Sequence, residues 1–150
     1  MLSIFIYAYG IADKLQSPNE FPTPLLHLTY VLQQSADALL ESSIGVGLSS
    51  VRVMSALSDR TPRSQQMVAS QLRQTESYVS RQLRVMKKQN LVKVARNKKD
   101  GRQRDVVLTN NGKHKLQKAV KLLEAQQRRL LPRKDAKLFD QSVDKFLSHI

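Results

Sequence analysis

The sequence predicts a mainly α-helical fold that contains one small β-hairpin. Apolar residues recur at intervals of three and four over most of the 150-residue chain, which is the period of a helix with one buried side. Two short runs typical of strands, "LVKV" and "DVVLT", flank a turn that is rich in Lys and Arg. With 41% hydrophobic residues, the chain has the composition of one globular domain rather than of a disordered segment.

Residues 1–24 are expected to form an apolar arm followed by a linker. Three prolines between Ser17 and Pro24 exclude a continuous helix there. The apolar stretch 1–12 has no basic start and no small-residue cleavage site, and it is too short to span a bilayer as a helix. The arm is therefore expected to be a packing segment or a buried helix, and a poorly ordered terminus is the alternative.

Three helices are expected next. The first runs from Pro24 to about Glu41 and ends before two glycines. The second is short, and its apolar residues, spaced three apart, are Val51, Met54 and Leu57. The third has an apolar side made of Met67, Val68 and Leu72. Either Thr61 or Ser64 can cap this third helix.

The segment 75–89 is predicted to form a helix with one apolar side and one polar and basic side. One apolar stripe, at i, i+4 and i+7, consists of Val79, Leu83 and Met86. The residues that fall on the opposite side at 100° per residue are Ser77, Arg81, Arg84 and Lys88. Thr75 is the expected N-cap, and Asn90 can end the helix in a left-handed conformation.

The hairpin and two further helices complete the chain. A long helix follows the hairpin and ends where Pro132 breaks it; its apolar stripe contains Leu116, Val120, Leu123, Leu130 and Leu131. Two short helices followed at once by a basic hairpin form a helix-turn-helix with a wing. We therefore expect a single domain with its core over 25–131 and a C-terminal helix over 132–150.

The net charge of +13 is concentrated in the centre of the chain. Residues 60–134 hold 21 basic and 4 acidic residues, a net of +17, and the remainder of the chain is at −4. A concentrated positive field attracts a polyanion, and nucleic acid is the commonest such partner. The surface of an anionic membrane is the alternative.

The sequence offers no catalytic or metal-binding motif. It has no cysteine, which excludes disulfides and thiolate metal sites. Its histidines, His27, His114 and His149, are scattered and come with no carboxylate pair, and its five glycines form no phosphate-binding loop. We therefore expect a protein that is not an enzyme, has no cofactor and is located in the cytoplasm at the nucleoid.

Three central segments share a known pattern: "GLSSVRVMSAL" (47–57), "MVASQLRQTESYVSRQLRVMKKQNLV" (67–92) and "DGRQRDVVLTNNG" (100–112). They resemble the MarR family of winged-helix transcription factors (multiple-antibiotic-resistance regulators). The third segment is the most specific, because its residues match the family's Asp-x-Arg at the wing tip and its Leu-Thr-x-x-Gly motif. The matching residues are Asp100, Arg102, Leu108, Thr109 and Gly112.

The chain departs from the family pattern in two places. Asn90 stands where the family usually has Gly, and Met86-Lys87 stands where it usually has Leu-Glu. The second difference makes the helix more basic. The arm at 1–12 matches no motif of the family.

The resemblance implies that the chain binds DNA, with the helix 75–89 in the major groove and the wing 96–105 at the minor groove. Ser77 and Arg81 are then expected near base edges, because Arg pairs bidentately with guanine. This helix is expected to make further DNA contacts through its N-cap, Thr75, and a residue on its flank, Tyr78. Arg84 and Lys88 are expected to contact the DNA backbone.

The basic wing is expected to reach the minor groove, whose negative potential attracts Arg where it is narrow. Arg102 is the candidate for insertion, and the family resemblance implies that Asp100 holds the wing in shape. The residues expected to face phosphates are Lys98, Lys99 and Arg104. An exposed charged turn that only aids solubility is the alternative.

The resemblance also implies a homodimer formed by the first and last helices. The last helix has an apolar stripe that requires a partner, formed by Phe139, Val143, Phe146, Leu147 and Ile150. A monomer that buries this stripe internally is the alternative.

The function expected from the resemblance is that of a repressor at a pseudo-palindromic operator, with release by a small, often aromatic, ligand. Candidate ligand contacts are His27, Tyr30 and Arg52, by family analogy alone. The alternative is a winged-helix protein that binds DNA without sequence preference or docks a partner protein.

Overall fold

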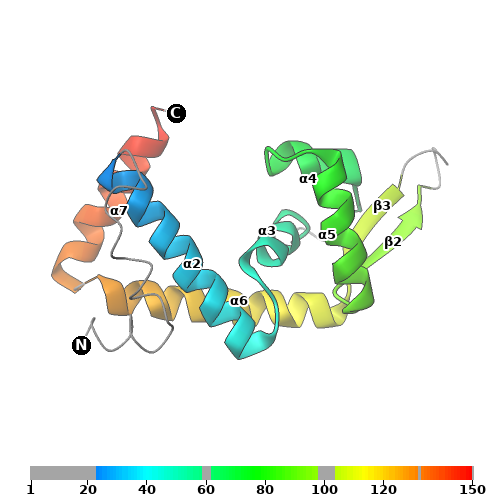
Figure 1. Ribbon diagram of the computed structural model, residues 1–150, viewed down its shortest axis with the longest axis horizontal. Helices are drawn as coiled ribbons and strands as arrows, with labels where there is room; N and C mark the ends of the chain where they lie inside the picture. Colours follow the sequence, from blue (N-terminus) through cyan, green and yellow to red (C-terminus); the bar gives the residue numbers. More distant parts are fainter. Residues whose placement is uncertain (1–22, 59–61, 98–103, 132, 150) are drawn as a thin grey trace. The chain divides into compact units, whose positions relative to one another are not determined.

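The computed structural model describes residues 23–58, 62–97, 104–131 and 133–149 (Figure 1). Its elements are α2 (Pro24–Ile44), α3 (Leu48–Ala56), β1 (Arg63–Ser64), α4 (Gln65–Gln71), α5 (Glu76–Lys88), β2 (Val92–Arg96), β3 (Arg104–Leu108), α6 (Asn110–Leu130) and α7 (Arg133–Leu147). This order confirms the predicted fold class, a mainly α-helical protein with a β-hairpin that follows two short helices.

The chain divides into two compact units. We call Asp37–Val120 the central unit, and Met1–Ala36 together with Lys121–Ile150 the terminal unit. The helices α2 and α6 each begin in one unit and end in the other. Among the described helices, none is both long and apolar enough to cross a membrane.

The central unit contains the hydrophobic core. In the described part of the chain, every buried apolar side chain lies in this unit, from Leu40 in α2 to Ala119 in α6. The largest of these fully buried side chains are Leu40, Met54, Leu57, Met86 and Leu91. The core therefore combines side chains from α2, α3 and α5 with Leu57, which follows α3, and Leu91, which follows α5.

The sheet of the central unit has three antiparallel strands in the order β1-β3-β2. Val106 of the middle strand is fully buried and lies opposite Val94 of β2 and Arg63 of β1. The sequence reasoning did not predict β1. Its two residues are too few to carry an alternating pattern, and its last residue, Ser64, caps α4 as predicted by accepting a hydrogen bond from the backbone N–H of Met67 at 3.1 Å.

The end of α2 differs slightly from the prediction. The helix continues past Glu41 to Ile44 and stops at Gly45, whose φ of +63° is left-handed. The Lys115 Nζ atom donates a hydrogen bond to the Ile44 carbonyl oxygen at 2.6 Å, which satisfies one of the helix-terminal carbonyls. Asp37 Oδ1 accepts a hydrogen bond from the backbone N–H at the start of α3 at 2.6 Å, so α2 fixes where α3 begins.

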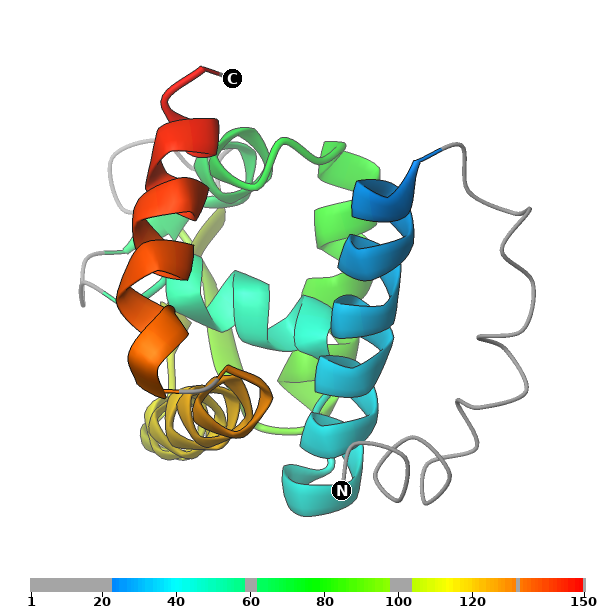
Figure 2. The same ribbon diagram turned by 90° about the vertical axis from the view of Figure 1, so that its left-hand side faces the viewer.

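The terminal unit exposes much of its apolar surface. Its exposed large side chains include Leu25, Leu26, Leu28, Leu138, Phe146 and Leu147. Figure 2 shows α7 (orange to red) and the blue first half of α2 as separate helices. Within this unit, Gln126 Nε2 of α6 donates a hydrogen bond to Ser35 Oγ of α2 at 2.7 Å.

Candidate nucleic-acid interface

The helix α5 has well-defined ends, as its sequence predicts. Thr75 Oγ1 accepts a hydrogen bond from the backbone N–H of Tyr78 at 3.2 Å and caps the first turn. At the other end, Asn90 has a φ of +55°, and the N–H of Leu91 donates to the carbonyl oxygen of Met86 at 2.9 Å. This is the Schellman arrangement that usually employs glycine. Both predicted end residues are thus confirmed.

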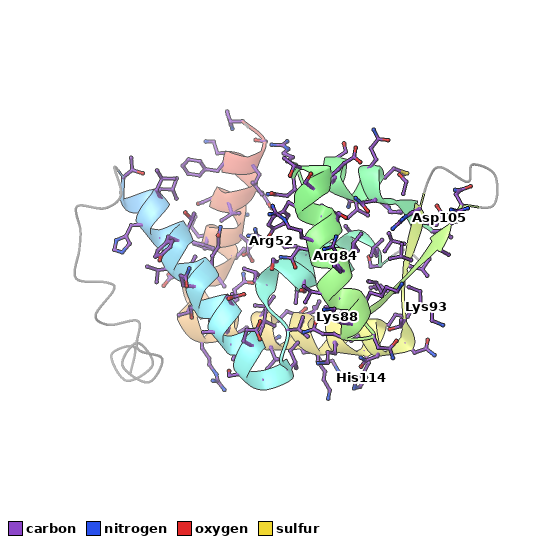
Figure 3. The ribbon with its side chains drawn as sticks, turned by 45° about the vertical axis from the view of Figure 1, so that its right-hand side comes forward. Arg52, Arg84, Lys88, Lys93, Asp105 and His114 are labelled. Atoms are coloured by element: carbon purple, nitrogen blue, oxygen red, sulfur yellow. The ribbon has the colours of Figure 1, made fainter. Side chains whose placement is uncertain are left out.

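The two sides of α5 differ as the periodicity predicts. Val79, Leu83 and Met86 are buried. The predicted opposite side, Ser77, Arg81, Arg84 and Lys88, is exposed. Figure 3 shows Arg84 and Lys88 on the outer side of this green helix. Val85 is also exposed, by 50%, on this basic side, and the sequence reasoning did not single it out.

The turn between α4 and α5 orients the two helices. Arg73 takes a left-handed φ of +51°, and Gln74 N donates to the Ala69 carbonyl oxygen at 2.9 Å, which closes α4. Gln65 Nε2, at the start of α4, donates to the Glu76 carbonyl oxygen at the start of α5, at 3.2 Å. The second contact joins the N-terminal ends of the two helices, so α4 and α5 form a fixed helix-turn-helix.

The start of α6 is held against the end of α5 by several hydrogen bonds, in which the Thr109 hydroxyl group is central. Thr109 Oγ1 donates to the carbonyl oxygen of Asn90 at 2.6 Å and accepts from the N–H of Gly112 at 3.0 Å. A Cβ atom at Gly112 would lie 2.1 Å from the carbonyl oxygen of Leu91, so only glycine fits there. The motif Leu-Thr-x-x-Gly therefore fixes α5 from its C-terminal end.

The hairpin brings its basic residues next to α5. Arg96 of β2 and Arg104 of β3 are directly opposite each other, and both are exposed. Behind them, Asn97 Nδ2 donates to Asp105 Oδ1 at 3.0 Å. The predicted residues of the wing tip, Lys98, Lys99, Asp100 and Arg102, lie outside the described residues. Their roles remain predictions.

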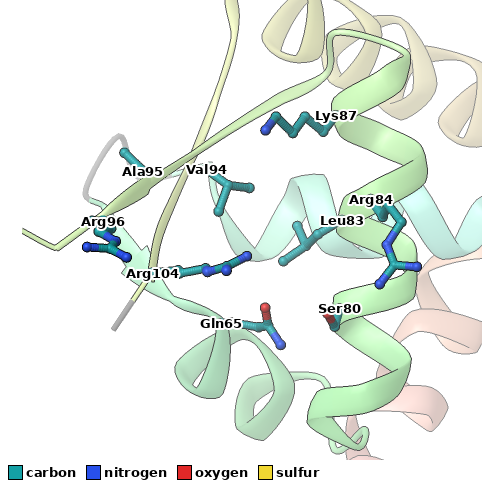
Figure 4. A pocket seen from close by; sticks show the side chains of 9 residues that line it. All are labelled: Gln65, Ser80, Leu83, Arg84, Lys87, Val94, Ala95, Arg96 and Arg104. Atoms are coloured by element: carbon teal, nitrogen blue, oxygen red, sulfur yellow. The ribbon is translucent and has the colours of Figure 1, made fainter. Parts of the chain in front are cut away.

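A groove lies between α5 and the hairpin. Its volume is about 330 Å³, and its lining consists of Gln65, Ser80, Leu83, Arg84, Lys87, Val94, Ala95, Arg96 and Arg104 (Figure 4). The sequence pattern did not indicate Lys87 and Arg96 as site residues. Neither belongs to the side of α5 opposite the core or to the wing tip, and only the packing of β2 on α5 brings them together.

The predicted dimer residues lie on the last helix. Phe139, Val143, Phe146 and Leu147 are exposed on α7, and Ile150 is outside the described residues. The candidate ligand residues are divided between the units: His27 and Tyr30 are half-buried on α2, and Arg52 is exposed on α3. Within the described residues, no group of three or more His, Cys, Asp or Glu side chains is arranged to hold a metal ion.

Residues 44–103 match the model of the MarR family. Among solved structures, the chain resembles AbsC, a MarR family transcriptional regulator from Streptomyces coelicolor, with 23% identity and a TM-score of 0.68 over 83% of this chain and 88% of that one. It resembles S. aureus MepR in a complex with DNA, with 20% identity and a TM-score of 0.68 over 87% and 100% of the two chains.

A third similar structure is a mutant MarR from E. coli complexed with operator DNA, with 19% identity and a TM-score of 0.67 over 83% of this chain and 94% of that one. Among curated protein sequences, none is significantly similar to this chain. The resemblance predicted from the sequence motifs is confirmed by the family match, and the predicted winged-helix fold by the solved structures.

Proposed function

We propose that this chain is a MarR-family transcriptional regulator that binds a specific double-stranded DNA site as a homodimer and represses transcription there. The observation that carries the proposal is the exposed side of α5. A helix that buries Val79, Leu83 and Met86 leaves a polar and basic surface on its other side, together with the exposed Val85. A helix of this kind fits the major groove.

In the proposed complex, Ser77 and Arg81 read base edges from the first half of α5. The exposed methyl groups of Val85 suit contact with a thymine methyl. The phosphates are contacted by residues at the cap, on the flank and along the rest of α5, and by one residue of the hairpin. These residues are Thr75, Tyr78, Arg84, Lys88 and Arg104. The wing tip, with Arg102 inserted and Lys98, Lys99 and Asp100 around it, reaches the minor groove.

The proposed dimer uses the apolar side of α7. Phe146 is 65% exposed and Leu147 is 63% exposed, and burying a side chain of this size stabilises an assembly by about 1.5–3 kcal/mol. Phe139 and Val143 lie on the same helix and are partly exposed. A symmetric dimer presents two copies of α5 and therefore fits a pseudo-palindromic operator.

Release of DNA by a small aromatic ligand, and a location in the cytoplasm at the nucleoid, are further parts of the proposal. They rest on the family resemblance alone. His27, Tyr30 and Arg52 are the residues proposed to contact the ligand.

A fluorescence-anisotropy titration tests the proposal. The labelled duplex is the region upstream of the protein's own gene, and a scrambled duplex of the same length is the control. A specific regulator whose target lies in this region prefers its site by about 10³-fold or more, with affinity that falls as salt rises. Equal, salt-dependent affinity for both duplexes would instead favour the non-specific architectural function, and binding to neither would contradict the proposal.

Two variants of α5 sharpen this test. Arg81→Ala is expected to weaken binding to the specific site by about 1–3 kcal/mol and to relax specificity, because it removes a base contact. Lys88→Ala is expected to weaken binding to both duplexes alike, because a phosphate contact carries no sequence information. Reversed behaviour of the two variants would contradict the assigned orientation of α5.

A further inference from the structure

We infer that the groove between α5 and the β2–β3 hairpin holds the DNA backbone strand that separates the major from the minor groove. The inference rests on the proposed function and extends it to lining residues that are not among the DNA contacts proposed above, chiefly Lys87 and Arg96. The bound group is a phosphodiester of DNA, contacted without regard to sequence.

The geometry of the duplex supports this assignment. In B-DNA, a major groove and the adjacent minor groove are separated by a single sugar–phosphate strand. A protein that places a helix in one groove and a hairpin in the next must straddle this strand. The surface between α5 and the hairpin then faces phosphates and not base edges.

The lining of the groove matches an anionic strand. Four of its residues are cationic: Arg84 and Lys87 from α5, Arg96 from β2 and Arg104 from β3. None of the lining residues is a carboxylate. Figure 4 shows Lys87 and Arg104 extending from opposite walls into the space between the helix and the hairpin. Such a concentration of like charge on both walls attracts a polyanion.

The strand register provides a second, independent observation. Arg96 and Arg104 are paired directly across the two strands. Like charges in this position are destabilising in an isolated hairpin. The nearby carboxylate of Asp105 accepts a hydrogen bond from Asn97 and is not part of the lining. A phosphate strand between the walls would relieve the repulsion that the fold itself creates here.

The remaining lining residues suit the same ligand. Leu83 and Val94 give the groove an apolar part, and charge interactions are stronger beside apolar groups than in open water. The Ser80 hydroxyl is a neutral donor of the kind that often contacts phosphate oxygens. Neither feature distinguishes one base from another, so the groove contributes to affinity and to register.

Salt dependence of binding to a random-sequence duplex measures this contribution without knowledge of the operator. Each phosphate contact adds about 0.9 to the slope of log K against log salt. The double variant Lys87→Gln/Arg96→Gln is expected to lower this slope by roughly 1–2 relative to the wild-type chain. It is expected to lower affinity for specific and random DNA by the same factor.

Two control variants accompany the test. Lys118→Gln/Lys121→Gln removes the same net charge from exposed positions on α6, outside the groove, and is expected to change the slope far less. Lys87→Arg/Arg96→Lys retains both charges in the groove and is expected to keep the wild-type slope. A melting temperature equal to that of the wild type excludes unfolding, because both groove residues are exposed.

The outcomes separate this inference from the proposed function. If the wild-type chain binds no duplex, the proposed function fails. If it binds DNA but the groove and control variants lower the slope equally, only the inference fails. A final arm replaces chloride by inorganic phosphate at constant ionic strength. Phosphate is expected to displace DNA more from the wild-type chain than from Lys87→Gln/Arg96→Gln, because it competes for the groove only where both cations are present. Equal displacement from the two chains would contradict the inference.

Discussion

The central and terminal units differ in how far they bury their apolar side chains. In the described residues, all buried apolar side chains belong to the central unit, whereas ten of the thirteen exposed large ones belong to the terminal unit. The central unit therefore has a core of its own. The terminal unit has helices whose apolar sides are exposed in the described residues, and apolar surface of this kind is typical of a site that binds a partner.

The charges of the two units differ in the same way. Residues 37–120 hold 17 basic and 6 acidic residues, a net of +11, and the rest of the chain holds 8 basic and 6 acidic residues, a net of +2. Strong like charge opposes self-association and favours a polyanion, whereas a nearly neutral apolar surface favours a second copy. The central unit thus suits a polyanion, and the terminal unit suits the second copy proposed above.

The largest effect is expected in the terminal unit. The double variant Phe146→Ser/Leu147→Ser removes two exposed apolar side chains of α7 from the proposed interface. At about 1.5–3 kcal/mol for each side chain, the loss corresponds to at least a 100-fold weaker dimer. Analytical ultracentrifugation over a range of protein concentrations measures the dimer dissociation constant.

The matched control is Lys137→Ser/Lys145→Ser, which places the same new residue at two exposed charged positions of α7. It is expected to leave the dissociation constant nearly unchanged. Equal dimerisation by both double variants and the wild type would contradict the assignment of α7 to the interface. A wild-type chain that stays monomeric at every concentration would do the same.

A smaller effect is expected from truncating one methionine in the core. Met86→Ala is expected to lower the free energy of unfolding by about 2–5 kcal/mol, because Met86 is fully buried. Met67→Ala makes the same chemical change at a side chain that is 55% exposed and is expected to cost less than about 0.5 kcal/mol. Urea unfolding monitored by circular dichroism measures both. Similar losses for the two variants would show that burial does not determine stability in the central unit.

The smallest of these effects is expected at the junction of α5 and α6. Gly112→Ala is expected to cost about 1–3 kcal/mol, because the added Cβ atom meets the Leu91 backbone and the two segments must move apart. The neighbouring Lys113→Ala, at an exposed position of the same helix, is expected to be close to neutral. Their melting temperatures, measured side by side, provide the test, and an unchanged Gly112→Ala would contradict the close approach.

The sequence predicted the elements whose signals are local. For α5, the period of Val79, Leu83 and Met86 and the capping chemistry of Thr75 and Asn90 were enough to define the helix, its buried side and both ends. On α6 the same reasoning was less accurate. It placed Val120 on the apolar stripe, yet Val120 is exposed and the buried residues are Gly112 and Ala119. Small residues allow close packing but give a weak periodic signal.

Contacts between segments that are distant in the chain could not be predicted from the sequence. The strand β1 depends entirely on its partner β3, because two residues alone have no tendency to form a strand. Lys87 and Arg96 line the same groove only when β2 packs on α5. The exposed basic side of α5 was predictable because it is a property of one helix, whereas the groove is a property of two elements.

The hydrogen bond that caps α6 also affects how fast an asparagine in the first turn of this helix deamidates. Asn111-Gly112 is the dipeptide in which asparagine deamidates fastest, since the glycine nitrogen readily attacks the side-chain amide. Here that N–H donates to Thr109 Oγ1 at 3.0 Å, and both residues are held in the first turn of a helix. The folded chain should therefore keep this asparagine intact over storage that deamidates it in urea, a difference that peptide mass spectrometry detects. An early rise of deamidation at this position would then report local opening of the α5–α6 junction before any loss of the overall fold.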